Sequence, residues 1–135
     1  MVGLVIVCHE DMGAELVKAA EMIVGRIDAV ETVSVKQDSA PETLRERVQN
    51  AIKKVDRKKG VMLMTDMFGG TPSNLSFTFQ KDGLVEIITG VNLPMLIKFV
   101  SLQRSNALKD VARKVVEQGR RNIHLASALL GSKPG

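Results

Sequence analysis

Four apolar runs along the chain have the pattern of β-strands. Residues 2–8 and 61–64 are apolar without alternation, which is typical of strands buried on both faces of a parallel sheet. Residues 32–36 instead alternate polar and apolar side chains, as an edge strand with one exposed face does. The fourth run, residues 84–89, follows the turn signal Lys81-Asp82-Gly83.

The segments between and after these runs carry apolar residues at spacings of three and four, which predicts amphipathic helices. The predicted helices cover residues 12–24, 41–55, 72–79, 94–100 and 108–116. Strands that alternate with helices in this way indicate an α/β sandwich with a largely parallel sheet. With no internal repeat or linker in 135 residues, the chain is expected to form one domain, residues 1–135.

Cap residues predict where several of these helices begin and end. Ser39 is expected to cap the second helix, with Pro41 in its first turn and Glu42 completing a capping box. Gly25 and Gly119 are expected to end the first and last helices. The C-terminal segment, about residues 120–135, is mixed in character, and residues 122–130 are compatible with a fifth strand or with a docking tail.

Three loops follow the carboxyl ends of predicted strands, and ligands of open α/β sheets collect at that edge. His9 ends the first strand, Asp66 follows the third, and residues 90–94 follow the fourth. A carboxylate that accepts one ring N–H fixes the tautomer of a histidine and leaves the other nitrogen with a free lone pair. Each residue alone is compatible with a structural role, but together they indicate a nucleophile or base.

The loop after Asp66 has the composition of an anion-binding turn. Gly69 and Gly70 allow a sharp turn and a close approach to a ligand, Thr71 is expected to cap the next helix, and Pro72 suits its first turn. The free amides at that helix start would point at an anion. Beside His9, such a cradle favours phosphoryl transfer.

Composition argues against several other functions. The net charge of +4 is spread along the chain and only four Phe, with no Trp or Tyr, are available to stack on bases, so nucleic-acid binding is disfavoured despite basic runs at residues 57–59 and 120–121. Two His and one Cys are too few for a zinc site, and no metal site is expected. The phosphate-binding and dinucleotide-binding glycine motifs are absent.

The lone Cys8 fits a reducing compartment, and the apolar start of the chain is too short for a membrane span, so a cytoplasmic location is expected. Among the methionines, Met12 and Met95 lie near the edge loops and are candidates for a surface that binds a partner.

Three segments of the chain together resemble the mannose-family enzyme IIA of the bacterial phosphoenolpyruvate:sugar phosphotransferase system. They are the strand ending in His9, the run Thr65-Asp66-Met67-Phe68-Gly69-Gly70-Thr71-Pro72-Ser73-Asn74 and the run Gly90-Val91-Asn92-Leu93-Pro94-Met95-Leu96. The resemblance implies that His9 accepts a phosphoryl group from the carrier protein HPr and passes it to a IIB component for sugar uptake. It also implies that Asp66 orients the ring, that Gly69, Gly70, Thr71 and Ser73 help to hold the phosphate, and that Phe68 supplies an apolar wall for partners.

The same resemblance implies a doubly wound three-layer fold and a homodimer that exchanges a C-terminal antiparallel strand, for which residues 122–126 are the candidate. It calls for no cofactor and for membrane contact only through the transporter. One departure is Glu10, followed by Asp11, where the family usually has glycine after the histidine.

Related modules serve dihydroxyacetone kinases or purely regulatory systems. A different class, a receiver-like signalling domain modified at Asp66 or not at all, is the alternative. A receiver also needs a lysine after a late strand, which residues 90–94 do not supply.

Overall fold

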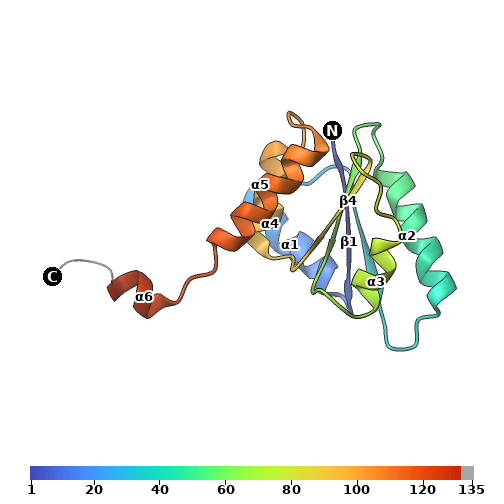
Figure 1. Cartoon of the computed structure of the whole chain (residues 1–135), viewed down its shortest axis with the longest axis horizontal. Helices are drawn as coiled ribbons and strands as arrows, with labels where there is room; N and C mark the ends of the chain where they lie inside the picture. Colours follow the sequence, from blue (N-terminus) through green and yellow to red (C-terminus); the bar gives the residue numbers. More distant parts are fainter. Residues whose placement is uncertain (132–135) are drawn as a thin grey trace.

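One parallel sheet with the strand order β2-β1-β3-β4 forms the centre of the computed structural model, which describes residues 1–131 (Figure 1). The strands are β1 (Gly3–His9), β2 (Val30–Val35), β3 (Val61–Thr65) and β4 (Val85–Thr89). The two continuously apolar runs therefore lie in the middle and the alternating run lies at an edge, as the sequence pattern predicts. The pairings between these four strands are parallel, so each strand ends at the same edge of the sheet.

Helices cover both faces of the sheet (Figure 1). One face packs against α1 (Met12–Val24), α4 (Leu93–Leu102) and α5 (Leu108–Arg121), and the other against α2 (Pro41–Val55) and α3 (Thr71–Phe77). The predicted three-layer α/β sandwich is confirmed.

The central strand β1 shows why its sequence is apolar without alternation. Leu4 and Ile6 belong to the core cluster under α1, α4 and α5, whereas Val5 and Val7 belong to the cluster under α2. Each of these side chains is completely buried. Burial of one such side chain contributes about 1.5–3 kcal/mol, so a strand covered on both faces gains this at every position.

The predicted helix caps at Ser39 and Gly119 are wrong, because each residue makes a contact with another part of the chain instead. Helix α2 has Ala40 at its N-cap without a side-chain hydrogen bond, and the Ser39 hydroxyl accepts a hydrogen bond from the Lys36 amide at 3.0 Å instead. Helix α5 runs through Gly119 to Arg121. A Cβ at position 119 would lie 2.7 Å from the Met95 side chain, so this glycine is needed for close packing. Gly25, with φ +84°, does end α1 as predicted.

The C-terminal segment leaves the body of the domain and ends in α6 (Ala126–Gly131), well away from the sheet (Figure 1). Residues 122–125 have no strand pairing, so the prediction of a fifth strand within the chain is wrong for residues 122–130. Residues 122–131 are all exposed, because no other part of the described chain covers them. An exchanged strand needs a second chain and stays a prediction, and residues 132–135 of the predicted tail lie outside the described part.

Candidate functional site

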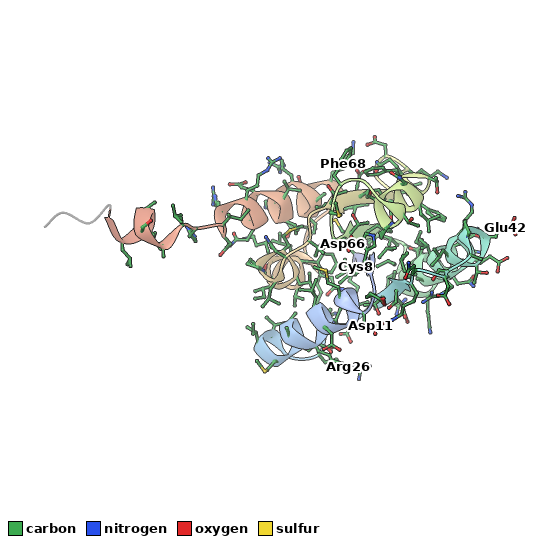
Figure 2. All side chains as sticks on the ribbon, turned by 90° about the horizontal axis from the view of Figure 1, so that it is seen from below. Cys8, Asp11, Arg26, Glu42, Asp66 and Phe68 are labelled. Atoms are coloured by element: carbon green, nitrogen blue, oxygen red, sulfur yellow. The ribbon has the colours of Figure 1, made fainter. Side chains whose placement is uncertain are left out.

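The carboxyl edge of the sheet brings His9 and Asp66 together from two central strands. In the parallel pairing Val7 lies opposite Thr65, so the chain leaves β1 and β3 at nearly the same level. Figure 2 shows the molecule from this edge, with Cys8 and Asp66 near the middle of the body and Phe68 towards its margin. The predicted convergence of these two loops is thus observed.

The His9 ring is held by a single carboxylate oxygen. Asp66 Oδ2 lies 2.8 Å from His9 Nδ1 and also accepts a hydrogen bond from the His9 backbone N–H at 2.9 Å. An ionised carboxylate can only accept, so Nδ1 carries the proton and Nε2 keeps its lone pair. Because the His9 side chain is 48% exposed while that of Asp66 is only 9% exposed, the nucleophilic nitrogen is accessible and its orienting partner is not.

Hydrogen bonding decides the charge of Asp66. Burial alone would raise the Asp66 pKa, but the hydrogen bonds from the His9 backbone N–H and from its ring hold it below its usual value. Asp66 Oδ1 is buried and, within residues 1–131, has no hydrogen-bond partner. The carboxylate is therefore ionised, and its Oδ2 atom binds both the backbone and the ring of His9.

The glycine turn lies directly in front of the free ring nitrogen. Gly69 and Gly70 both have left-handed φ angles, +89° and +86°. A Cβ at Gly70 would lie 3.6 Å from His9 Nε2, whereas a Cβ at Gly69 would meet nothing within 4 Å. The backbone at residue 70 therefore forms one wall of the space in which a group attached to Nε2 would sit.

The helix after this turn corrects two details of the predicted anion cradle. Gly70, not Thr71, is the N-cap of α3, which makes no side-chain cap bond, and Thr71 is the exposed first residue of the helix. Ser73 is completely buried and its hydroxyl donates to the Gly70 carbonyl at 3.3 Å. The Ser73 hydroxyl thus braces the turn, and Pro72 stands in the first turn as predicted.

Of the three side chains predicted to meet a partner, two are exposed near the site and one is not. Phe68 is 75% exposed, and Met12 is exposed at the start of α1. Met95 is only 3% exposed, because it fills the space left by Gly119 between α4 and α5. The prediction that Met95 lies on a binding surface is therefore wrong in this structure.

The third edge loop, residues 90–94, has a structural role that the sequence pattern did not reveal. The backbone N–H groups of Gly90 and Val91 both donate to the Thr65 carbonyl at 2.9 Å. Asn92 caps α4 by accepting from the Met95 amide at 3.1 Å, and it donates to the Gly119 carbonyl at 3.2 Å. This loop supports the end of β3, and so the backbone that carries Asp66.

The sequence identifies the Glu10 and Asp11 carboxylates after His9 but not Lys36, which binds both of them. Lys36 Nζ lies 3.0 Å from Glu10 Oε2 and 2.9 Å from Asp11 Oδ1. Glu10 itself has φ +51°, a conformation that favours glycine. The position of Lys36 directly after the edge strand could have indicated this contact. His9 and Val35 are register partners, so the residue after Val35 lies near the residue after His9.

The other candidate groups have no comparable geometry. Burial, followed by the Asp66 charge, raises the pKa of the Cys8 thiol to about 12, so this buried thiol stays protonated. Within residues 1–131 no group of three or more His, Cys, Asp or Glu side chains could hold a metal ion. No helix in the same range has both the length and the apolar character to cross a membrane. The arrangement as a whole suits a nucleophilic imidazole that carries an anionic group.

Comparison with known proteins agrees with this arrangement. A family model described as EIIA-man, PTS system fructose IIA component, matches residues 3–116. The chain is 29% identical over 128 residues to the PTS system fructose-specific EIIA component of Bacillus subtilis (strain 168), covering 94% of this chain and 88% of the relative. It is 30% identical over 129 residues to the PTS system mannose-specific EIIAB component of Escherichia coli (strain K12), covering 94% of this chain and 40% of that relative.

A crystal structure of phosphotransferase system component EIIA from Streptococcus agalactiae has a TM-score of 0.84 at 24% sequence identity, covering 95% of this chain and 99% of that chain. At that identity the likeness establishes the fold. The family match extends from β1 into α5 and includes both His9 and Asp66. The chain therefore belongs to the EIIA-man family, the PTS system fructose IIA components.

Proposed function

We propose that this chain is a cytoplasmic phosphocarrier that accepts a phosphoryl group on His9 Nε2 from phosphorylated HPr and passes it to a IIB component. The observation that carries the proposal is the fixed ring: Asp66 binds Nδ1 at 2.8 Å, and Nε2 is the only ring nitrogen left to attack phosphorus. The family membership supplies the class of donor and acceptor.

The geometry supports a direct displacement at phosphorus. The Nε2 lone pair forms the new P–N bond while the P–N bond to the donor histidine breaks, and the donor ring leaves with the bonding electron pair. Positive charge then develops on the His9 ring, where the Asp66 carboxylate stabilises it. Exposed Phe68 and Met12 supply apolar contact area for the protein partners.

The receiver-like alternative would place the phosphate on Asp66. The geometry does not favour it, because Asp66 Oδ2 is occupied by two hydrogen bonds from His9 and Oδ1 is buried. An acyl phosphate at this position would need the His9 contacts to break first.

The two chemistries differ in the stability of the covalent product. The full chain is incubated with phosphoenolpyruvate, enzyme I and HPr, and its intact mass is measured before and after acid, alkali and hydroxylamine treatment. A phosphoramidate on His9 survives alkali and is lost in acid, whereas an acyl phosphate is cleaved by hydroxylamine and base. One added phosphoryl group that resists alkali is expected, and an alkali-labile label would overturn the proposal.

The two glycines of the turn provide a matched pair of variants. Gly69→Ala and Gly70→Ala both place alanine at a positive φ and should each cost about 1–3 kcal/mol of stability. Only the methyl group at position 70 would stand beside Nε2, so Gly70→Ala should slow phosphorylation about tenfold more than Gly69→Ala does, a barrier difference of about 1.4 kcal/mol. Urea unfolding and the rate of mass increase separate the two effects, and equal rates would contradict the assignment of this wall.

We also propose that the chain works as a homodimer in which the C-terminal segment of one chain docks on the other. Apart from an isolated antiparallel bridge between Val85 and Lys81, the outer edge of β4 is unpaired in the described part of the chain, and beside it lies a groove of about 880 Å³. Its floor includes Ile88 of β4 and Val116 of α5. Ile123 and Leu125 in the extended segment are 77% and 71% exposed, which in water is unfavourable unless a second chain covers them.

Sedimentation velocity at micromolar concentration should therefore show a dimer for the full chain. Ending the chain after Asn122, one residue beyond α5, should give a monomer because the docking segment is removed while every core helix is kept. The variant Leu125→Asp is the matched full-length test, since a charge cannot be buried in an apolar groove without a large penalty. A wild-type chain that sediments only as a monomer would refute the dimer.

A further inference from the structure

Three charged side chains form a bonded cluster next to the proposed phosphoryl site. Lys36 Nζ bridges Glu10 Oε2 at 3.0 Å and Asp11 Oδ1 at 2.9 Å, and the Ser34 hydroxyl donates to the same Asp11 oxygen at 3.0 Å. Glu10 directly follows His9, and Lys36 directly follows Val35, the register partner of His9. The cluster therefore stands within two residues of the nucleophile, or of its register partner Val35, at the ends of two adjacent strands.

Glu10 is unfavourable there for the backbone, and both carboxylates are unfavourable for the reaction. A side chain at φ +51° costs about 1–2 kcal/mol relative to glycine. Two negative charges beside His9 also repel an incoming phosphoryl group, which carries nearly two negative charges itself. Nothing in the proposed phosphoryl transfer uses either carboxylate.

Lys36 is held in place from several sides. Its backbone N–H donates to the Ser39 hydroxyl at 3.0 Å, and its carbonyl accepts from the Ser39 amide at 3.1 Å. Arg47 donates to the Ser34 carbonyl at 3.0 Å, which fixes the strand end that precedes Lys36. The β2–α2 connection thus fixes the backbone from which the Lys36 side chain extends to the two carboxylates.

Both partners of the bridge are charged throughout the neutral range. The hydrogen bond to Asp11, followed by the one to Glu10, raises the pKa of Lys36 above its usual value. The hydrogen bond from Lys36, followed by the one from Ser34, lowers the pKa of Asp11. Their full charges interact near neutral pH.

Resting on the proposed phosphocarrier function, we propose that Lys36 is a positioning residue for phosphoryl transfer. It binds the Glu10 and Asp11 carboxylates, turns them away from His9 and compensates one of their two charges, so that an anionic phosphoryl group can approach Nε2. Lys36 does not contact the phosphate. Its effect on the rate therefore depends on the presence of the Glu10 charge.

The test compares Lys36→Met, Glu10→Gln and the double variant, each as the full chain with saturating phosphorylated HPr. Lys36→Met should slow the mass increase about fivefold at low salt, because the uncompensated negative charge repels the phosphoryl dianion, and less at high salt, where the repulsion is screened. The double variant has the same cluster charge as wild type and should regain most of the rate. Lys54→Met is the control, because Lys54 pairs with Glu31 at 3.3 Å at the opposite edge of the sheet.

Each result decides one question. A double variant as slow as Lys36→Met would mean that Lys36 contacts the donor or the phosphate directly, and this would overturn the proposal. A Lys36→Met chain with the wild-type rate, or one no slower than Lys54→Met, would overturn it as well. If the wild-type chain takes up no label under any condition, the phosphocarrier function fails first, and the positioning role of Lys36 fails with it.

Discussion

Replacing His9 with alanine is expected to remove all phosphorylation of the chain while leaving the fold intact. No other side chain in the described structure combines a free nucleophilic lone pair with a carboxylate that orients it. The neighbouring Cys8 is buried, with its thiol pKa raised to about 12, and is protonated at neutral pH. His124 lies in the exposed segment beyond α5, away from the glycine turn. Intact mass should therefore show no added phosphoryl group.

The fold should survive because the His9 ring is about half exposed and its one side-chain hydrogen bond is to Asp66. The backbone hydrogen bond from residue 9 to Asp66 remains possible in the alanine variant, so the carboxylate keeps one partner. His124→Ala is the matched control and should be labelled like wild type. An alkali-stable label that persists in His9→Ala would refute the assignment of the acceptor.

The meeting of His9 and Asp66 was predictable because it needs only the order of strands. Two continuously apolar runs in a chain of alternating strands and helices must lie centrally in a parallel sheet, and parallel strands end at one edge. The side chains that directly follow such strands are then close neighbours. The order of strands does not, however, predict the hydrogen-bond geometry between His9 and Asp66 or the burial of Asp66.

Contacts between distant segments account for what could not be predicted. Gly119 has the sequence context of a helix end, yet it lies within α5 because Met95 from α4 occupies the space where a side chain would be. Ser39 has the context of an N-cap, yet its hydroxyl binds the Lys36 amide. A local sequence pattern indicates only where a helix tends to begin or end. In both cases a contact with another segment gave the residue a different role.

The substitution Asp66→Asn is expected to keep the fold and slow phosphoryl transfer to His9 about 100-fold, because a neutral amide stabilises the developing ring charge far less than a carboxylate does. In a hydrolase triad the corresponding change costs about 10⁴ in rate, but there the histidine acts as a base, whereas here it is itself the nucleophile. The amide oxygen can still accept from Nδ1 and from the His9 amide. The expected loss is thus mainly one of charge.

Unfolding experiments at two pH values distinguish this electrostatic role from a purely structural one. The Asp66 pKa is lowered in the folded chain, so the carboxylate contributes stability that is fully present above its unfolded pKa of about 3.9 and is lost as the pH falls through the lower folded pKa. The difference in unfolding free energy between wild type and Asp66→Asn should then shift in favour of wild type from pH 3 to pH 7. A variant that is phosphorylated at the wild-type rate would exclude Asp66 from the mechanism, and one that fails to fold at pH 7 would make it a structural residue at the end of β3.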